Sequence, residues 1–209
     1  MKQILRGALL LALAIAARAQ EILPREEAVK AAAILNFDLE QLADTPIPTD
    51  ADVKRPYGLR AGHRGVLVVP EAKLTSAAIA SAGSQTIPIG QLWLAEVVPM
   101  RDGDPIPVDE LKMVEIEYEG DEITLPLCVL GVRRGEAKRL EILVYGRGAE
   151  PLLIVPLREI RRDQAWPIEM AAQSESEVSA RLTLVLAGVY QASFSITIPA
   201  PKDDAQPEE

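Results

Sequence analysis

The sequence predicts a mainly β protein, an antiparallel β-sandwich with an N-terminal helix and one short internal helix. Three observations lead to this fold class. Short segments alternate apolar and polar side chains, turns rich in glycine and proline separate these segments, and two of the resulting hairpins can be assigned a register. An open barrel built from the same hairpins is the alternative.

Helical character is concentrated ahead of the predicted sandwich. Segment 24–44 begins with proline, places Glu26 and Glu27 where a helix favours acidic side chains, and is rich in alanine. Its second half, NFDLEQL, also fits a separate turn. Segment 45–58 contains three prolines and is expected to be an extended linker. The short internal helix is expected over 70–83, which starts at a proline and ends at a glycine.

Strands are expected over 65–70 and over 86–99, the latter interrupted by Pro88 and Gly90. A hairpin follows over 112–131. A two-residue loop at 120–121 would pair Tyr118 with Ile123 and keep the apolar side chains of both strands on one face, leaving Glu115 and Glu117 in water. A second hairpin is expected over 139–157, turning through 146–150. Because both of its strands are apolar on both faces, we expect them to lie centrally.

The third hairpin, over 179–199, is constrained by parity. One face of each strand carries apolar side chains at even-numbered positions, so an odd loop is required, and a three-residue loop at 187–189 pairs Leu186 with Tyr190 and Leu182 with Phe194. This hairpin, with its aromatic-bearing last strand, resembles the end of an immunoglobulin-like sandwich in architecture. The paired cysteines of true immunoglobulin domains are absent.

The first 19 residues have the layout of a secretory signal peptide. Lys2 and Arg6 precede an apolar stretch over 7–17, and Ala17-Arg18-Ala19 is a small-x-small cleavage site. The apolar stretch is short for a membrane span, although an uncleaved N-terminal anchor is the alternative. We therefore predict export to the periplasm or the medium, with cleavage after Ala19.

The predicted organisation is a signal peptide (1–19), a helical extension with a proline-rich linker (20–58), the β-sandwich domain (59–199) and a disordered acidic tail (200–209). Removing the signal peptide, with its three basic residues, would change the net charge from −9 to −12. Such an acidic chain is not expected to bind nucleic acid or an anionic membrane surface. No second long apolar run follows, so no transmembrane segment is expected after signal removal.

Single residues offer little catalytic or metal-binding chemistry. Cys128 is the one cysteine and lies among aliphatic residues, so we expect a buried, structural thiol. His63 is the one histidine, stands between glycines ahead of a strand, and is expected to be a partly exposed turn residue whose replacement by alanine leaves fold and function intact. A zinc site needs more histidine and cysteine ligands, and no G-x-S-x-G element supplies a serine nucleophile.

The acidic and basic clusters are interpreted in the same way. Carboxylates in 102–110 and in 117–122 lack the spacing of a calcium loop and are expected to be solvated, with calcium stabilisation as a minor hypothesis. Basic residues cluster over 133–139 and 158–162. We expect them to pair with surplus carboxylates or face water, the alternative being a docking patch for an acidic polymer or partner. Trp93 lies in an apolar strand and is expected in the core.

No catalytic, cofactor-binding or metal-binding residue is therefore assigned, and no cofactor is expected. The sequence favours an exported, non-enzymatic accessory or interaction module of a bacterial-type envelope, binding an unidentified protein or polymer through a sheet edge or end loops. The bacterial assignment depends on the form of the signal peptide and the absence of disulfides. The alternative is a small secreted hydrolase using a pair of acidic residues.

Overall fold

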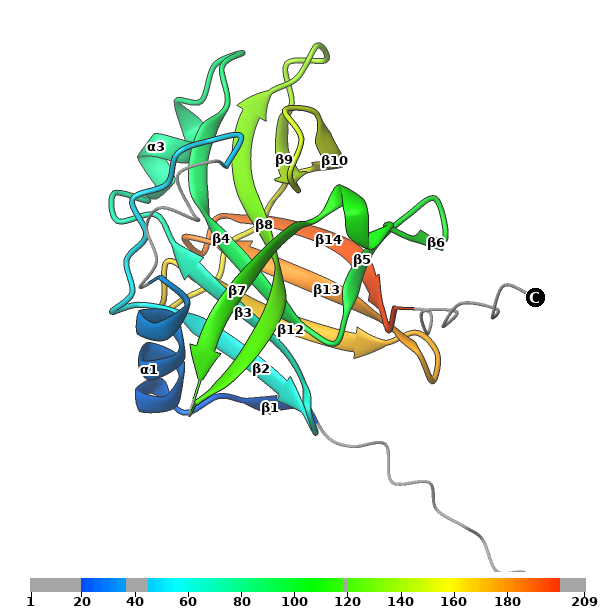
Figure 1. Ribbon diagram of the computed structural model, residues 1–209. Helices are drawn as coiled ribbons and strands as arrows, with labels where there is room; N and C mark the ends of the chain where they lie inside the picture. The colour runs from blue at the N-terminus through cyan, green and yellow to red at the C-terminus, as the bar shows by residue number, and fades with distance from the viewer. Residues whose placement is uncertain (1–19, 37–44, 119, 200–209) are drawn as a thin grey trace, which may run out of the picture.

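The computed structural model describes residues 20–36, 45–118 and 120–199 (Figure 1). The predicted signal peptide, the predicted acidic tail and the second half of the predicted first helix lie outside these residues. The first sheet has eight strands: β1 (Glu21–Ile22), β2 (Tyr57–Ala61), β3 (Arg64–Pro70), β4 (Ile87–Ala95), β7 (Lys112–Tyr118), β8 (Asp121–Arg134), β9 (Leu140–Tyr145) and β10 (Pro151–Pro156). The second has six: β5 (Val98–Arg101), β6 (Asp104–Pro105), β11 (Arg158–Glu159), β12 (Ile168–Ser174), β13 (Ser179–Leu186) and β14 (Tyr190–Thr197).

The two antiparallel sheets and two short helices confirm the predicted mainly β sandwich. Helix α1 spans Arg25–Leu35, helix α3 spans Ser76–Ala80, and a 3-10 turn, η1, covers Val108–Glu110. The internal helix is shorter than the predicted 70–83. Pro70 ends strand β3, and α3 begins only after Thr75, whose hydroxyl accepts a hydrogen bond from the Ala78 backbone N–H (3.1 Å).

The main core lies between the two sheets. Its members are the inward-facing aliphatic side chains of β3, β4, β8 and β9 on one side and of β12, β13 and β14 on the other; among them are Val68, Leu92, Leu130, Ile142, Leu182 and Leu184, all fully buried. A second apolar cluster lies on the opposite face of the first sheet. There Ala28, Ala32 and Leu35 of α1 pack against Leu67 and Trp93. The first sheet is thus covered on both faces, which explains its apolar strands.

The order of the strands shows how the chain passes between the sheets. The first sheet runs β1-β2-β3-β4-β8-β9-β10, with β7 added beside β8, and the second runs β12-β13-β14-β5-β6, with β11 beside β14. Strand β4 leads directly into β5 of the second sheet, and Glu96 at this corner has a positive φ of 55°. An immunoglobulin sandwich instead places strands A, B, E and D in one sheet and C, F and G in the other.

The C-terminal hairpin has the predicted register. Leu186 pairs with Tyr190, Leu184 with Ala192 and Leu182 with Phe194, across a loop at 187–189. Ala187 and Gly188 adopt φ angles of 49° and 69°, as a tight loop of this length requires. Parity of the apolar side chains was therefore sufficient to determine this loop.

The hairpin of β7 and β8 turns one residue earlier than predicted. Tyr118 pairs with Asp121 and Ile116 with Ile123, so the predicted pairing of Tyr118 with Ile123 is wrong by two residues. The loop contains Gly120 with a φ of 92°, which places the left-handed backbone conformation at the glycine. The apolar faces are unchanged by a two-residue shift, and Glu115 and Glu117 are exposed as expected.

The hairpin of β9 and β10 turns through 146–150 as predicted, but only one of its strands is central. Strand β9 lies between β8 and β10, whereas β10 is the edge of the first sheet, and Ile154 is 49% exposed there. Prolines at both ends, Pro151 and Pro156, suit an edge because proline has no N–H to donate to a further strand. The apolar composition of β10 thus predicted a central position, whereas the strand lies at the edge of the sheet.

Candidate functional site

His63 lies in the tight turn between β2 and β3, where Gly62 has a φ of 68°. Its Nε2 is 2.9 Å from Glu96 Oε2, and both side chains are about three-fifths exposed, at 61% and 59%. The sequence had suggested no companion for His63. Glu96 was missed because the strand corner after β4, not proximity in sequence, brings it to this turn.

Cys128 is fully buried in β8, as predicted. Burial raises the pKa of its thiol from an ordinary 9.0 to about 12, because the apolar surroundings disfavour the thiolate.

We expect Cys128 to resist iodoacetamide in the native protein at about pH 8 and to react readily in about 8 M urea, because the thiolate is the nucleophile. Because burial raises the pKa, the unfolded chain releases the thiol proton at a lower pH than the folded protein does. This thiol therefore leaves the free energy of unfolding unchanged below pH 9 and lowers it as pH rises toward 12. Mass spectrometry of the alkylated chain checks the first expectation. Rapid modification without urea would contradict it.

The charged clusters have the structural partners expected of surface residues. Arg133 pairs with Glu141 and Arg162 with Glu169, while Arg134 donates to the carbonyls of Ala80 and Lys138. The described carboxylates within 102–110 and 117–122 are mostly exposed on turns and strands. Among the described residues, no group of histidine, cysteine and carboxylate side chains has the arrangement of a metal site.

The two tryptophans have different surroundings. Trp93 is buried on the outer face of the first sheet, and its Nε1–H donates to Gln91 Oε1 (3.1 Å), whose amide in turn donates to Thr49 Oγ1 (2.9 Å). Trp166 lies in the segment between β11 and β12, with the Arg25 guanidinium 5.1 Å from its ring centroid. Trp93 is therefore core, as predicted, and Trp166 joins the N-terminal helix to the second sheet through a cation–π contact.

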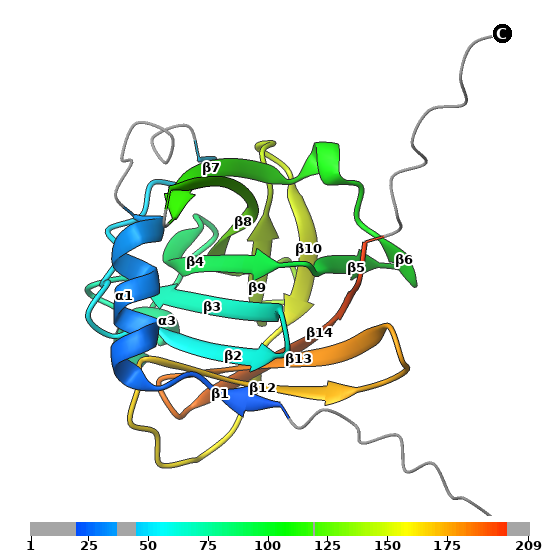
Figure 2. The same ribbon diagram turned by 60° about the horizontal axis from the view of Figure 1, so that its bottom comes forward.

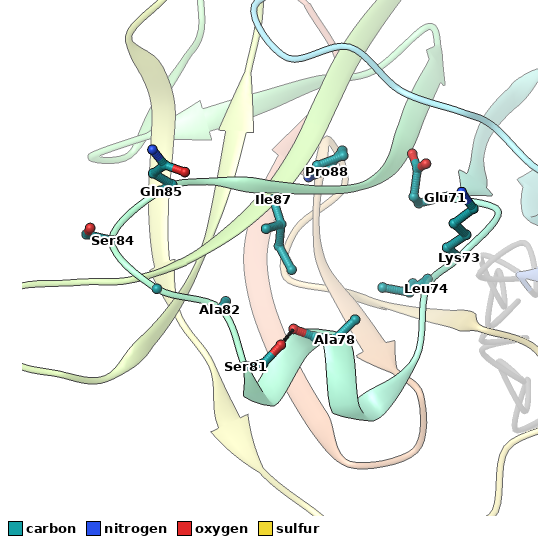
Figure 3. Close-up of a pocket in the computed structure, with 11 residues that line it drawn as sticks. Glu71, Lys73, Leu74, Ala78, Ser81, Ala82, Ser84, Gln85, Ile87 and Pro88 are labelled. Carbon is teal, nitrogen blue, oxygen red and sulfur yellow. Dashed lines mark hydrogen bonds between the residues drawn. The ribbon is translucent and has the colours of Figure 1, made fainter.

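A polar hollow of about 600 Å³ lies inside the connection between β3 and β4 (Figure 3). Leu74, Ala78 and Ile87 form its apolar base. Glu71 and Lys73 stand together at one side, and the hydroxyl of Ser84 and the amide of Gln85 lie at the other. The volume falls in the range of small-molecule sites, and the polar groups come from a connecting loop.

Glu71 is the one carboxylate among the described residues that line the polar hollow. Partial burial raises its pKa, and this effect outweighs the hydrogen bond that its Oε2 accepts from the Asp50 backbone N–H (2.9 Å). A glycosidase-type mechanism needs two carboxyl groups facing each other across the substrate. The hollow supplies one of them.

A second hollow, of about 270 Å³, lies on the outer face of the first sheet between α1 and the β7–β8 hairpin. We call it the apolar trough. Leu67, Trp93 and Ala95 form its floor, and the side chains of Ala31, Ile34, Ile116, Tyr118, Ile123 and Leu125 form its two walls. Figures 1 and 2 show α1 beside the tip of the hairpin. Tyr118 and Ile123 stay 40% and 38% exposed, so this apolar surface is open to solvent.

Small residues keep the trough near the sheet open. Leu23, ahead of α1, packs directly over Gly58 of β2, and a methyl group added at Gly58 would clash with it. Next to this contact, Gly65 and Ala95 occupy paired positions on β3 and β4. His63 lies at the end of the same trough. Gly58 and Gly65 both lie within strands, where the missing side chain leaves room for Leu23 and for the floor of the trough.

Neither helix among the described residues has the length and apolar character to cross a membrane. No family model matches the chain, and no curated protein or solved structure is significantly similar to it.

Proposed function

We propose that the chain is an exported, non-enzymatic interaction module of a bacterial-type envelope, and that it binds its partner through the apolar trough. The observation that carries the proposal is the exposed apolar surface of Tyr118 and Ile123 beside the open floor of Ala95. An apolar surface of this kind, framed by polar residues, is typical of an interaction site. The trough lies partly on a hairpin tip, which fits binding through end loops.

The sheet edges offer less to a partner. On the outer side of β12, the Ala172 backbone N–H already donates to Gln20 Oε1 (3.0 Å). Strand β10 is bounded by Pro151 and Pro156, which restrict the addition of a further strand. The hydrolase alternative has Glu71 as its one carboxylate in the polar hollow. The trough therefore gives the better-supported binding surface.

The test is the binding of Nile red, a neutral apolar dye, to the purified chain. We expect saturable binding, weakened about fivefold or more by Ile123→Asp, because a wall of the trough becomes charged. The matched control is Val178→Asp, which charges a 55%-exposed apolar residue between β12 and β13 and is expected to leave dye affinity unchanged. Absence of saturable binding, or equal loss in both variants, would overturn the proposal.

A further inference from the structure

The charged side chains of the apolar trough gather at one end of it. Figure 2 shows α1 at one end of β2 and β3 and the turn between these strands at the other. Toward α1 and the hairpin, the trough is lined by aliphatic and aromatic side chains. The charged or titratable residues that line it are Arg60, His63 and Arg64, all close to the turn, and no described carboxylate is among the lining residues. The trough thus has an apolar body and a basic end.

Two of these basic side chains already have carboxylate partners. Arg60 lies between Glu21 (3.2 Å) and Glu27 (3.4 Å), which both approach its guanidinium. His63 contacts Glu96 through its Nε2. These pairs leave Arg64 as the remaining cation of the basic end.

Arg64 has a donor that the protein itself does not satisfy. Its Nε–H is shielded from solvent and has no hydrogen-bond partner, and no salt bridge joins Arg64 to a carboxylate among the described residues. A buried donor left unpaired costs more free energy than an ordinary hydrogen bond contributes. Native proteins rarely leave such a group without an acceptor, and a bound ligand is one way to supply it. Arg64 therefore indicates where an anionic group binds.

The body of the trough determines what can carry that anionic group. Strands β3 and β4 beneath it are each paired on both sides, so their backbone groups are already hydrogen-bonded. The Trp93 N–H is also engaged, by Gln91, which leaves the Tyr118 hydroxyl as the one further polar side-chain group among the described lining residues. A peptide would bury its own N–H and C=O groups here without partners, whereas an alkyl chain has none to satisfy.

We propose that the apolar trough binds a free single-chain amphiphile with a carboxylate head group, that is, a fatty acid. Its alkyl chain lies over Leu67, Trp93 and Ala95, and its carboxylate accepts hydrogen bonds from the Arg64 guanidinium, whose planar fork matches a carboxylate. The volume of about 270 Å³ is just below the usual range of small-molecule sites, about 300–1,000 Å³, and favours a chain of medium length. This inference rests on the proposed function, because it names the chemical class that the same trough binds.

The test compares three amphiphiles that share their chain length and differ in head group: decanoate, decanol and decyltrimethylammonium. Each is titrated into the full chain below its micellar concentration, in competition with Nile red. We expect decanoate to bind about tenfold more tightly than decanol, because a charge-assisted hydrogen bond to Arg64 adds to the same apolar contact. The cationic amphiphile should bind most weakly of the three.

Variants of Arg64 assign the head-group contact. Arg64→Gln should weaken decanoate about tenfold and leave the affinities for decanol and Nile red unchanged. It should not lower the melting temperature, because the Nε–H that it removes is unpaired in the free protein. Arg64→Lys keeps the charge and should retain part of the preference for decanoate. The matched control is Arg158→Gln, an exposed residue of β11 in the second sheet, which should change no affinity.

Equal affinity for decanoate and decanol, or equal loss in Arg64→Gln and Arg158→Gln, with Nile red still bound, would overturn the carboxylate head group and leave the trough as a binding site. Displacement of Nile red by a leucine-rich amphipathic peptide, but by none of the three amphiphiles, would overturn the alkyl ligand and keep the proposed function. Failure of Nile red and of every ligand to bind would overturn both.

Discussion

Replacing Trp93 with alanine is expected to lower the free energy of unfolding by about 3–5 kcal/mol. Trp93 is 2% exposed and fills the space between the first sheet and α1, next to Leu67 and Leu127. Its removal would leave a cavity that the alanines of α1 are too small to fill. It would also remove the donor to Gln91 Oε1, and Gln91 is itself 2% exposed, so an amide oxygen would be left buried and unpaired.

The measurement is urea unfolding followed by circular dichroism, with Trp166 as an independent fluorescence probe. Trp93→Phe is the partial control, since it keeps one aromatic ring but loses the N–H and the rest of the indole; we expect a smaller destabilisation from it, of about 1–3 kcal/mol. A loss below about 1 kcal/mol for the alanine variant would mean that α1 does not pack firmly on this face.

Strand pairing within hairpins was predictable wherever side-chain parity left one solution. The apolar side chains that face the main core from the last two strands are even-numbered, and only an odd loop brings Leu182 opposite Phe194. In the β7–β8 hairpin, a loop at 119–120 and a loop at 120–121 give each residue a different cross-strand partner. The two pairings differ by two residues, so every side chain stays on the same face in both. In this hairpin the apolar pattern therefore predicted which face each side chain occupies, but not which residues are cross-strand partners.

The candidate site was not predictable, because it depends on which elements pack together. The alternation of Val114, Ile116 and Tyr118 indicates an apolar face, and in a sandwich the apolar faces of the strands usually form the core between the two sheets. Instead Val114 and Ile116 pack with α1 on the outer face of the first sheet. One signal was available: β3 is apolar at both odd and even positions, which requires cover on both faces. Nothing local identifies α1 as that cover.

Replacing Gly90 with alanine is the other change with a large expected effect, about 2–5 kcal/mol of lost stability. Gly90 is buried at an irregularity in the pairing of β4 with β8, and it also pairs with Pro70 of β3. Its φ of 153° is one that L side chains rarely adopt, and an added Cβ would lie 2.5 Å from the Val69 carbonyl oxygen. Because that oxygen belongs to the backbone of a central strand, rotation of a side chain cannot relieve the contact.

Two effects destabilise the Gly90→Ala variant, backbone strain and the clash with Val69, and a substitution at a second glycine allows them to be measured separately. Gly120 has a φ of 92°, but a Cβ there would meet no atom within 4 Å, so Gly120→Ala adds backbone strain without a clash. We expect that variant to lose about 1 kcal/mol, and the excess loss in Gly90→Ala to measure the clash between β3 and β4. Urea unfolding of both variants gives the comparison. Equal losses would show that β3 shifts to admit the methyl group, which would contradict a closely packed central sheet at this position.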